Sequence, residues 1–132
     1  PKIMTTWRRP LKRTYLIIVS SEVKESLAPT LHRNLAFNEQ IGVIGHELGH
    51  TAYYVERNSF KVIMAGIRYG SDKFKVPFER DTDKRAIAHH LGYQLYDWSQ
   101  AVHQTLEANG RGTHYLSPEE ILVEMERYEG YP

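Results

Sequence analysis

The sequence contains no cysteine and no long apolar run among its 132 residues. Without cysteine, the chain has no disulfides, no thiolate zinc ligands and no cysteine nucleophile. The longest apolar run covers only residues 16–19, so we expect no membrane-spanning segment. A signal peptide is not expected either, because the apolar stretch at residues 15–19 is short and no small-residue cleavage site follows it.

A strong net charge is also missing. The 17 Lys and Arg residues nearly balance the 16 Asp and Glu residues, which gives a formal charge of +1. No overall field therefore draws the chain to nucleic acid or to a membrane surface. Basic side chains do gather in residues 1–13, but a nucleic-acid-binding arm there is the weakest hypothesis, because no groove-reading motif accompanies it.

Length and composition are those of one globular domain. Hydrophobic residues make up 41% of the chain and charged residues 25%, so we expect residues 1–132 to form a single domain. Residues 14–20 are rich in β-branched and aromatic side chains and predict a strand, while residues 21–36 predict a loop. Residues 60–69 fit either a short helix or a strand.

Helices are predicted over most of the remaining chain. Apolar periodicity, helix-breaking glycines and a capping box at Ser117 predict four of them, at residues 37–57, 77–91, 93–109 and 118–129. Pro77 is expected to open the second helix. The expected fold class is therefore α+β, a mostly helical domain with a small N-terminal sheet or strand and an active-site helix.

The first predicted helix carries the motif H-E-x-x-H, formed by His46, Glu47 and His50. Positions i and i+4 lie on one face of a helix, one turn apart, so the two imidazoles can bind one zinc ion through neutral nitrogen donors. The glutamate beside the first histidine then reaches a metal-bound water without binding the metal itself. The pattern predicts a zinc site with Glu47 as the general base.

A helical wheel separates the two histidines from the apolar face of their own helix. We expect that apolar face to point to the core; it consists of Ile41, Ile44, Leu48, Ala52 and Val55. Between the two faces lies a stripe of glycines: Gly42, Gly45 and Gly49. Glycine inside a helix costs about 1 kcal/mol relative to alanine, so the stripe indicates that another backbone approaches closely. We expect the helix with the third ligand to pack there.

A catalytic zinc needs a third protein ligand and a vacant position. The second helix offers Glu79 and Asp83 on one face, so one carboxylate can bind the metal while the other accepts a hydrogen bond from a ligating histidine. The residues alone leave open which of the two is the ligand, and Asp81, His89 and His90 are further candidates.

These motifs resemble the zincin metallopeptidases, and among them the gluzincins, such as thermolysin-like and HtpX-type proteases. In that group H-E-x-x-H is followed by a glutamate ligand within an E-x-x-x-D stretch on a later helix. The resemblance therefore implies Glu79 as the third ligand and Asp83 as the histidine partner, with Asp83 as the first alternative ligand. The resemblance covers only these two helices, and Thr82 stands where HtpX-type proteins usually carry alanine. The metzincin class does not fit, because Tyr53 and Glu56 replace its glycine and third histidine. The resemblance also implies that residues 14–20 bind substrate as an added strand.

The expected function is that of a zinc metalloendopeptidase acting on peptide or protein substrates. Zn²⁺ would lower the pKa of its bound water, and Glu47 would carry the proton to the leaving amine. The side chains that could donate a hydrogen bond to the developing oxyanion are Tyr54, Tyr93, Tyr96, His103 and His114. Of these, we name His103 and Tyr93 as the possible oxyanion stabilisers. The alternative is a non-catalytic zinc-binding module, regulatory or structural, on the same scaffold. Glu47 weighs against it, because a structural site has no use for a base.

Overall fold

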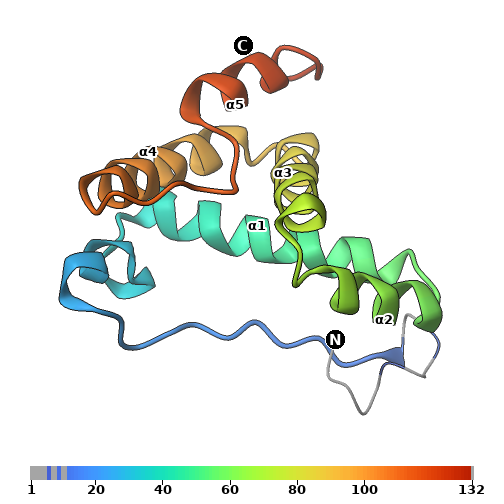
Figure 1. Cartoon of the computed structure of the whole chain (residues 1–132). Coiled ribbons are helices and arrows are strands. Elements are labelled where there is room, and N and C mark those ends of the chain that lie inside the picture. Colours follow the sequence, from blue (N-terminus) through green and yellow to red (C-terminus); the bar gives the residue numbers. More distant parts are fainter. Residues whose placement is uncertain (1–5, 7–8, 10–11, 132) are drawn as a thin grey trace.

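A computed structural model describes Thr6, Arg9 and residues 12–131 of the chain. In chain order its helices are η3 (Glu25–Thr30), η4 (His32–Asn34), α1 (Phe37–Val55), α2 (Ser59–Arg68), α3 (Asp72–Ala88), α4 (Gly92–Ala108) and α5 (Pro118–Met125). Figure 1 shows α1 in the middle, with α3 and α4 against one side of it and α5 beyond them. Among the described helices, none is long and apolar enough to cross a bilayer.

The predicted α+β class is wrong, because no strand forms among the described residues. Residues 14–20 are extended, as their β-branched and aromatic composition predicts, but none of them is assigned to a strand. Strand propensity reflects the fit of a side chain to a pleated surface, and a sheet also needs a neighbouring strand. The described chain is a helical assembly, and its extended segment at residues 14–20 runs alongside α1 (Figure 1).

Two anchors place the extended segment beside α1. At its start, the buried guanidinium of Arg13 donates hydrogen bonds to the carbonyl oxygens of Tyr54 (2.9 Å) and Arg57 (2.8 Å), where α1 ends. A cation is favoured there, because the last carbonyls of a helix lack partners and carry partial negative charge. Beyond the far end of the segment, Leu31 and Leu35 are buried close to the start of α1. The segment therefore runs antiparallel to α1.

Most helix positions agree with the local sequence signals. α1 and α4 match the helices predicted at residues 37–57 and 93–109 to within two residues at each end. Residues 60–69 are helical as α2, and the predicted loop at residues 21–36 contains the short helices η3 and η4. The capping box at Ser117 forms as predicted, although α5 ends earlier than expected.

The start of α3 differs from the prediction. The helix begins at Asp72, directly after the turn at Gly70 and Ser71, and Pro77 lies inside it instead of at its first position. Proline lacks the amide hydrogen that would bond to the carbonyl four residues earlier, so a proline at this place loses one hydrogen bond near the helix start. The loss of one hydrogen bond does not prevent the helical turn before Pro77 from forming.

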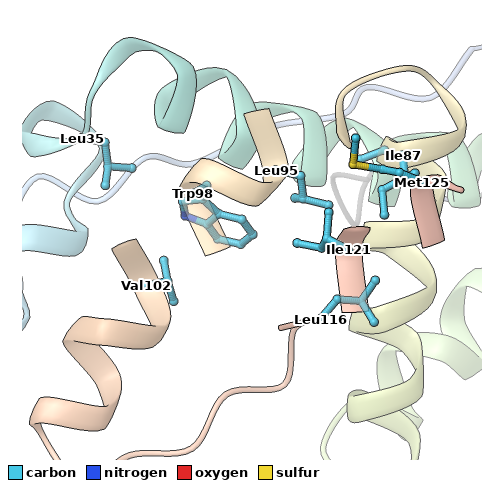
Figure 2. Packing of buried hydrophobic residues seen from close by; sticks show 9 residues of the cluster. Leu35, Ile87, Leu95, Trp98, Val102, Leu116, Ile121 and Met125 are labelled. Atoms are coloured by element: carbon cyan, nitrogen blue, oxygen red, sulfur yellow. The ribbon is translucent and has the colours of Figure 1, made fainter. Parts of the chain in front are cut away.

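The hydrophobic core gathers around α4. Its residues Leu95, Trp98 and Val102 are buried against Ile87 of α3 and Ile121 of α5, and Figure 2 shows these side chains converging. Burial of one such aliphatic side chain contributes about 1.5–3 kcal/mol to stability. The core thus fixes α3 and α4 relative to each other, and with them the surface against which α1 packs.

α1 turns inward a face other than the predicted one. None of the apolar residues expected to face the core is buried: Ile41, Ile44, Leu48, Ala52 and Val55. Leu48 is 51% exposed. The buried positions are instead Gly42, Gly45, His46 and Gly49. The prediction was wrong because α3 and α4 pack on the side of α1 where the two backbones can come closest.

The glycine stripe makes this close approach feasible. A Cβ atom added to Gly42 would collide with the backbone carbonyl of Gln94 in α4. One added to Gly49 would lie 3.0 Å from the carbonyl oxygen of Thr82 in α3. The expectation that the ligand-bearing helix packs on this stripe is thus confirmed at Gly49, while Gly42 accommodates α4. The contact at Gly49 brings the side chains of α3 within reach of the motif histidines.

Candidate metal centre

The two motif histidines and a carboxylate from α3 converge at one point. His46 and His50 project from consecutive turns of α1, with ring centroids 4.7 Å apart. Glu79 Oε2 lies 3.0 Å from His46 Nε2 and 3.2 Å from His50 Nε2. One donor atom from each residue lies within 4.8 Å of the other two. The three residues predicted as ligands are therefore neighbours, and their role as ligands stays a prediction.

The chemistry and spacing of these donors fit a zinc ion. Zinc binds imidazole nitrogen and carboxylate oxygen at about 2.0–2.2 Å, usually in a tetrahedron, so neighbouring donor atoms lie about 3.3 Å apart. The distances of 3.0 and 3.2 Å from Glu79 Oε2 need to open by only a few tenths of an ångström. His46 and Glu79 are buried, which limits competition from water.

Glu79 presents one oxygen to the histidines and the other to Tyr69, which follows the last residue of α2. The Tyr69 hydroxyl donates a short hydrogen bond to Oε1 of Glu79. Burial raises the pKa of Tyr69, and the bond to the carboxylate adds to this effect, so the hydroxyl keeps its proton at neutral pH. Oε1 is thereby occupied, and Oε2 is the oxygen left for a metal. No local spacing in the sequence identifies Tyr69, because it lies at the end of a different helix from the motif and from Glu79.

Asp83 contacts the second ring nitrogen of His46. Its Oδ1 lies 2.7 Å from His46 Nδ1, and its Oδ2 accepts a 2.8 Å hydrogen bond from the backbone amide of Leu116. A metal-binding histidine commonly donates its free N–H to a carboxylate, which fixes the ring orientation and the tautomer. This is the contact expected of Asp83 as the histidine partner. It also ties the loop before α5 to the site.

Hydrogen bonds within this cluster shift the pKa values of His46 and Glu79. Burial alone would lower the pKa of His46, but hydrogen bonds with Asp83 and Glu79 outweigh it and raise this pKa to about 9. Burial would in turn raise the pKa of Glu79, yet hydrogen bonds with His46, His50 and Tyr69 hold it well below its usual range. A protonated His46 can donate a hydrogen bond to Glu79 and another to Asp83, and a bound cation would take the place of its proton on the Glu79 side.

Thr82, the residue that departs from the HtpX-type pattern, lies beside the second motif histidine. Its buried hydroxyl oxygen is 3.2 Å from His50 Nδ1 and donates a 2.9 Å hydrogen bond to the carbonyl oxygen of Phe78. The Phe78 ring stacks on the imidazole of His50, with centroids 5.2 Å apart. Both His50 and His46 are thus held by residues of α3.

A cavity of about 360 Å³ opens beside the three donor atoms. Glu47 lines it, and so do residues 15–17 of the extended segment and the tyrosines Tyr54 and Tyr115. The Tyr115 ring meets that of His46 edge to face, with centroids 5.2 Å apart. Burial raises the pKa of both tyrosines, so their hydroxyls remain proton donors at neutral pH. The local sequence does not identify Tyr115 as a site residue, because it lies on a loop far along the chain from the motif.

The two oxyanion stabilisers predicted from the sequence, Tyr93 and His103, lie outside the cavity. Neither Tyr93 nor His103 lines the cavity, and the same holds for Tyr96 and His114. Tyr93 packs against Tyr131, with ring centroids 5.8 Å apart, and His103 interacts with the acidic first turn of α5. Tyr93, Tyr96 and His103 belong to α4, which packs on the glycine stripe of α1 and contributes no residue to the cavity wall. Of the sequence candidates, only Tyr54 lines the cavity.

The alternative ligands are not part of the donor cluster. Asp81, His89 and His90 are exposed on the surface of α3 and the turn that follows it. The ring of His90 packs against Tyr131 near the C-terminus, with centroids 5.7 Å apart. Within the described residues, the group formed by the motif histidines and Glu79 is the one that could hold a metal ion.

Comparisons with known proteins assign no family: no family model, curated protein or solved structure matches the chain. The geometry of the site and the chemistry of its residues therefore carry the functional assignment.

Proposed function

We propose that this chain is a zinc-dependent metallopeptidase with Glu47 as its general base. The observation that carries the proposal is the meeting of donor atoms from His46, His50 and Glu79 at a cavity that this glutamate also lines. A structural zinc site is normally closed by four protein ligands and needs neither a cavity nor a base. Three donors, a free carboxylate and open space beside them favour a catalytic site.

The residues around the cavity have separate tasks in hydrolysis. A bound Zn²⁺ would polarise the scissile carbonyl and lower the pKa of its water to about 7. Glu47 accepts the proton of the attacking water and returns it to the leaving amine. The hydroxyls of Tyr54 and Tyr115 are the donors available to the developing oxyanion. Asp83 keeps His46 oriented through its Nδ1.

The extended segment supports a peptide as the substrate. Residues 15–17 line the cavity, and no backbone hydrogen bond within the described chain pairs residues 16–20 with another segment. An extended peptide can add to such an edge through main-chain hydrogen bonds, while its alternate side chains enter neighbouring pockets. A peptide bound in this way passes between the segment and the face of α1 that carries Glu47.

Replacement of the base tests the proposal. Glu47→Gln keeps the size of the side chain but removes the proton acceptor, so the variant should bind zinc as well as the wild type does. Hydrolysis of a fluorescently labelled unfolded protein should fall about 100- to 10,000-fold. Glu56→Gln is the matched control just after the last residue of the same helix, because Glu56 is exposed and its partner among the described residues is Arg57. It should leave both zinc content and hydrolysis unchanged.

Two results would contradict the proposal. Wild-type protein that holds zinc but cleaves nothing across a broad peptide library would support the non-catalytic zinc-binding module instead. Equal hydrolysis by Glu47→Gln and the wild type would remove Glu47 from the mechanism.

A further inference from the structure

We propose that Thr82 is a positioning residue that fixes the orientation and tautomer of His50 by accepting a hydrogen bond from its Nδ1–H. The inference rests on the proposed metal centre and goes beyond it, because Thr82 belongs to neither the H-E-x-x-H motif nor the acidic pair on α3. It also assigns a task to the position at which the chain departs from the HtpX-type pattern.

The direction of the hydrogen bond follows from the contacts of the hydroxyl. Thr82 is 0% exposed, and its hydroxyl lies 2.9 Å from the carbonyl oxygen of Phe78. Because a carbonyl oxygen can only accept, we assign the single hydroxyl proton to this bond. The oxygen can then only accept from His50 Nδ1, which lies 3.2 Å away. Nδ1 of His50 therefore carries a proton. When a metal takes the place of the proton that Nε2 donates to Glu79 Oε2, the ring is neutral and its lone pair is on Nε2.

That tautomer is the one a metal at this place requires. His50 Nε2 is the ring atom that faces Glu79 Oε2, at 3.2 Å. A neutral imidazole that carries its proton on Nε2 has no lone pair there to offer a metal. The Thr82 hydroxyl thus does for His50 what the Asp83 carboxylate does for His46, with a neutral acceptor in place of a charged one.

The packing of α3 on α1 brings this hydroxyl into place. Thr82 reaches His50 at the point where the two helices touch, and a Cβ atom on Gly49 would lie 2.9 Å from the Thr82 methyl carbon. The absence of a side chain at Gly49 therefore allows the contact. The Phe78 ring also stacks on the His50 ring and further restricts its rotation.

The test compares one substitution that removes the hydroxyl with one that keeps it. Thr82→Val keeps the shape and removes the acceptor, whereas Thr82→Ser keeps the hydroxyl and loses a methyl group. Thr105→Val is the matched control, because Thr105 makes the same bond to a carbonyl four residues earlier, at 3.0 Å, on a helix outside the cavity wall. Zn²⁺ affinity is measured by competition with a chromophoric chelator, and the His50 Nδ1 proton is observed by NMR in zinc-loaded, ¹⁵N-histidine-labelled protein.

We expect Thr82→Val to bind Zn²⁺ about 10- to 100-fold more weakly, and Thr82→Ser and Thr105→Val to bind it within about threefold of the wild type. The Nδ1 proton of His50 should be slow to exchange in the wild type and in Thr82→Ser, and fast in Thr82→Val. Unchanged affinity and exchange in Thr82→Val would overturn the role of Thr82 alone. If Thr82→Val does not fold, a fast-exchanging Nδ1 proton in the wild type overturns it. A wild type that binds no Zn²⁺ would overturn both this inference and the proposed function.

Discussion

The two sides of α1 differ in composition and in surroundings. Composition predicts that the apolar side is buried, but the glycine side is buried instead. The glycine side, formed by Gly42, Gly45, His46 and Gly49, is buried under α3 and α4. The apolar side includes Ile41, Ile44 and Leu48, which line an open hollow on the surface. A helix usually buries its apolar stripe, yet here the buried side consists of three glycines and a histidine.

The difference shows what the packing of this helix achieves. Glycines allow backbones to approach closely, so side chains of α3 can reach the ring nitrogens of both motif histidines. A layer of leucine and isoleucine on that side would hold the helices farther apart. The glycine side of α1 therefore lets α3 approach closely enough to reach the histidines, while the apolar side stays accessible.

The largest effect is expected on the glycine side, at Gly42. Gly42→Ala places a methyl group against the backbone carbonyl of Gln94, which cannot move without shifting α4. The free energy of unfolding, measured by urea denaturation, should fall by about 3 kcal/mol. Gly66→Ala in α2 is the control, because an added Cβ meets nothing within 4 Å there; it should stabilise the protein by up to about 1 kcal/mol. Equal stability of the two variants would refute the close packing of α1 on α4.

A smaller effect is expected at Gly49. Gly49→Ala brings a methyl group against Thr82, at 2.9 Å from its methyl carbon, and α3 must move away slightly. The stability loss should be about 1–2 kcal/mol, and Zn²⁺ affinity should fall about tenfold because the hydroxyl of Thr82 leaves His50. Urea denaturation and chelator competition measure the two quantities. A stability loss without any change in affinity would separate the packing of the helices from the metal site.

Tyr69 lies at the edge of the site and should have a still smaller effect. Tyr69→Phe removes the hydrogen bond to Glu79 Oε1, which leaves this carboxylate free to turn. We expect Zn²⁺ affinity to fall about three- to tenfold. Tyr93→Phe is the matched control, since Tyr93 lies outside the cavity, and it should have no effect. An unchanged affinity in Tyr69→Phe would show that Glu79 is held without the tyrosine.

The smallest effect is expected on the apolar side. Leu48 lies between the two motif histidines in sequence but is 51% exposed. Leu48→Ala should change the free energy of unfolding by less than about 0.5 kcal/mol and leave Zn²⁺ affinity unchanged. A loss of 2 kcal/mol or more, typical of a buried leucine at about 2–5 kcal/mol, would mean that this side is covered in solution.

Local sequence signals account for much of the fold and for the centre of the site. Helices α1 and α4 and the cap of α5 follow from periodicity and from Ser117, because these signals act over a few neighbouring residues. The proximity of His46, His50 and Glu79 was also expected, because helix geometry fixes the first pair and a single helix contact adds the third.

The remainder depends on contacts between distant parts of the chain. Tyr69 and Tyr115 reach the site from a helix end and a loop, so no spacing within the sequence relates them to the motif. The inward side of α1 depends on where α3 and α4 can approach most closely, which apolar content does not specify. Residues 14–20 have the composition of a strand, but composition does not specify a partner strand, and none of these residues is assigned to a strand.

The most direct test of the account is a Zn²⁺ titration of metal-free protein with a competing chelator, carried out on the wild type, Glu79→Gln and Leu48→Ala. The account predicts about one Zn²⁺ per wild-type chain, the same for Leu48→Ala, and an affinity at least about 100-fold weaker for Glu79→Gln. A wild type that binds no Zn²⁺, or a Glu79→Gln variant that binds it as tightly as the wild type, would contradict it.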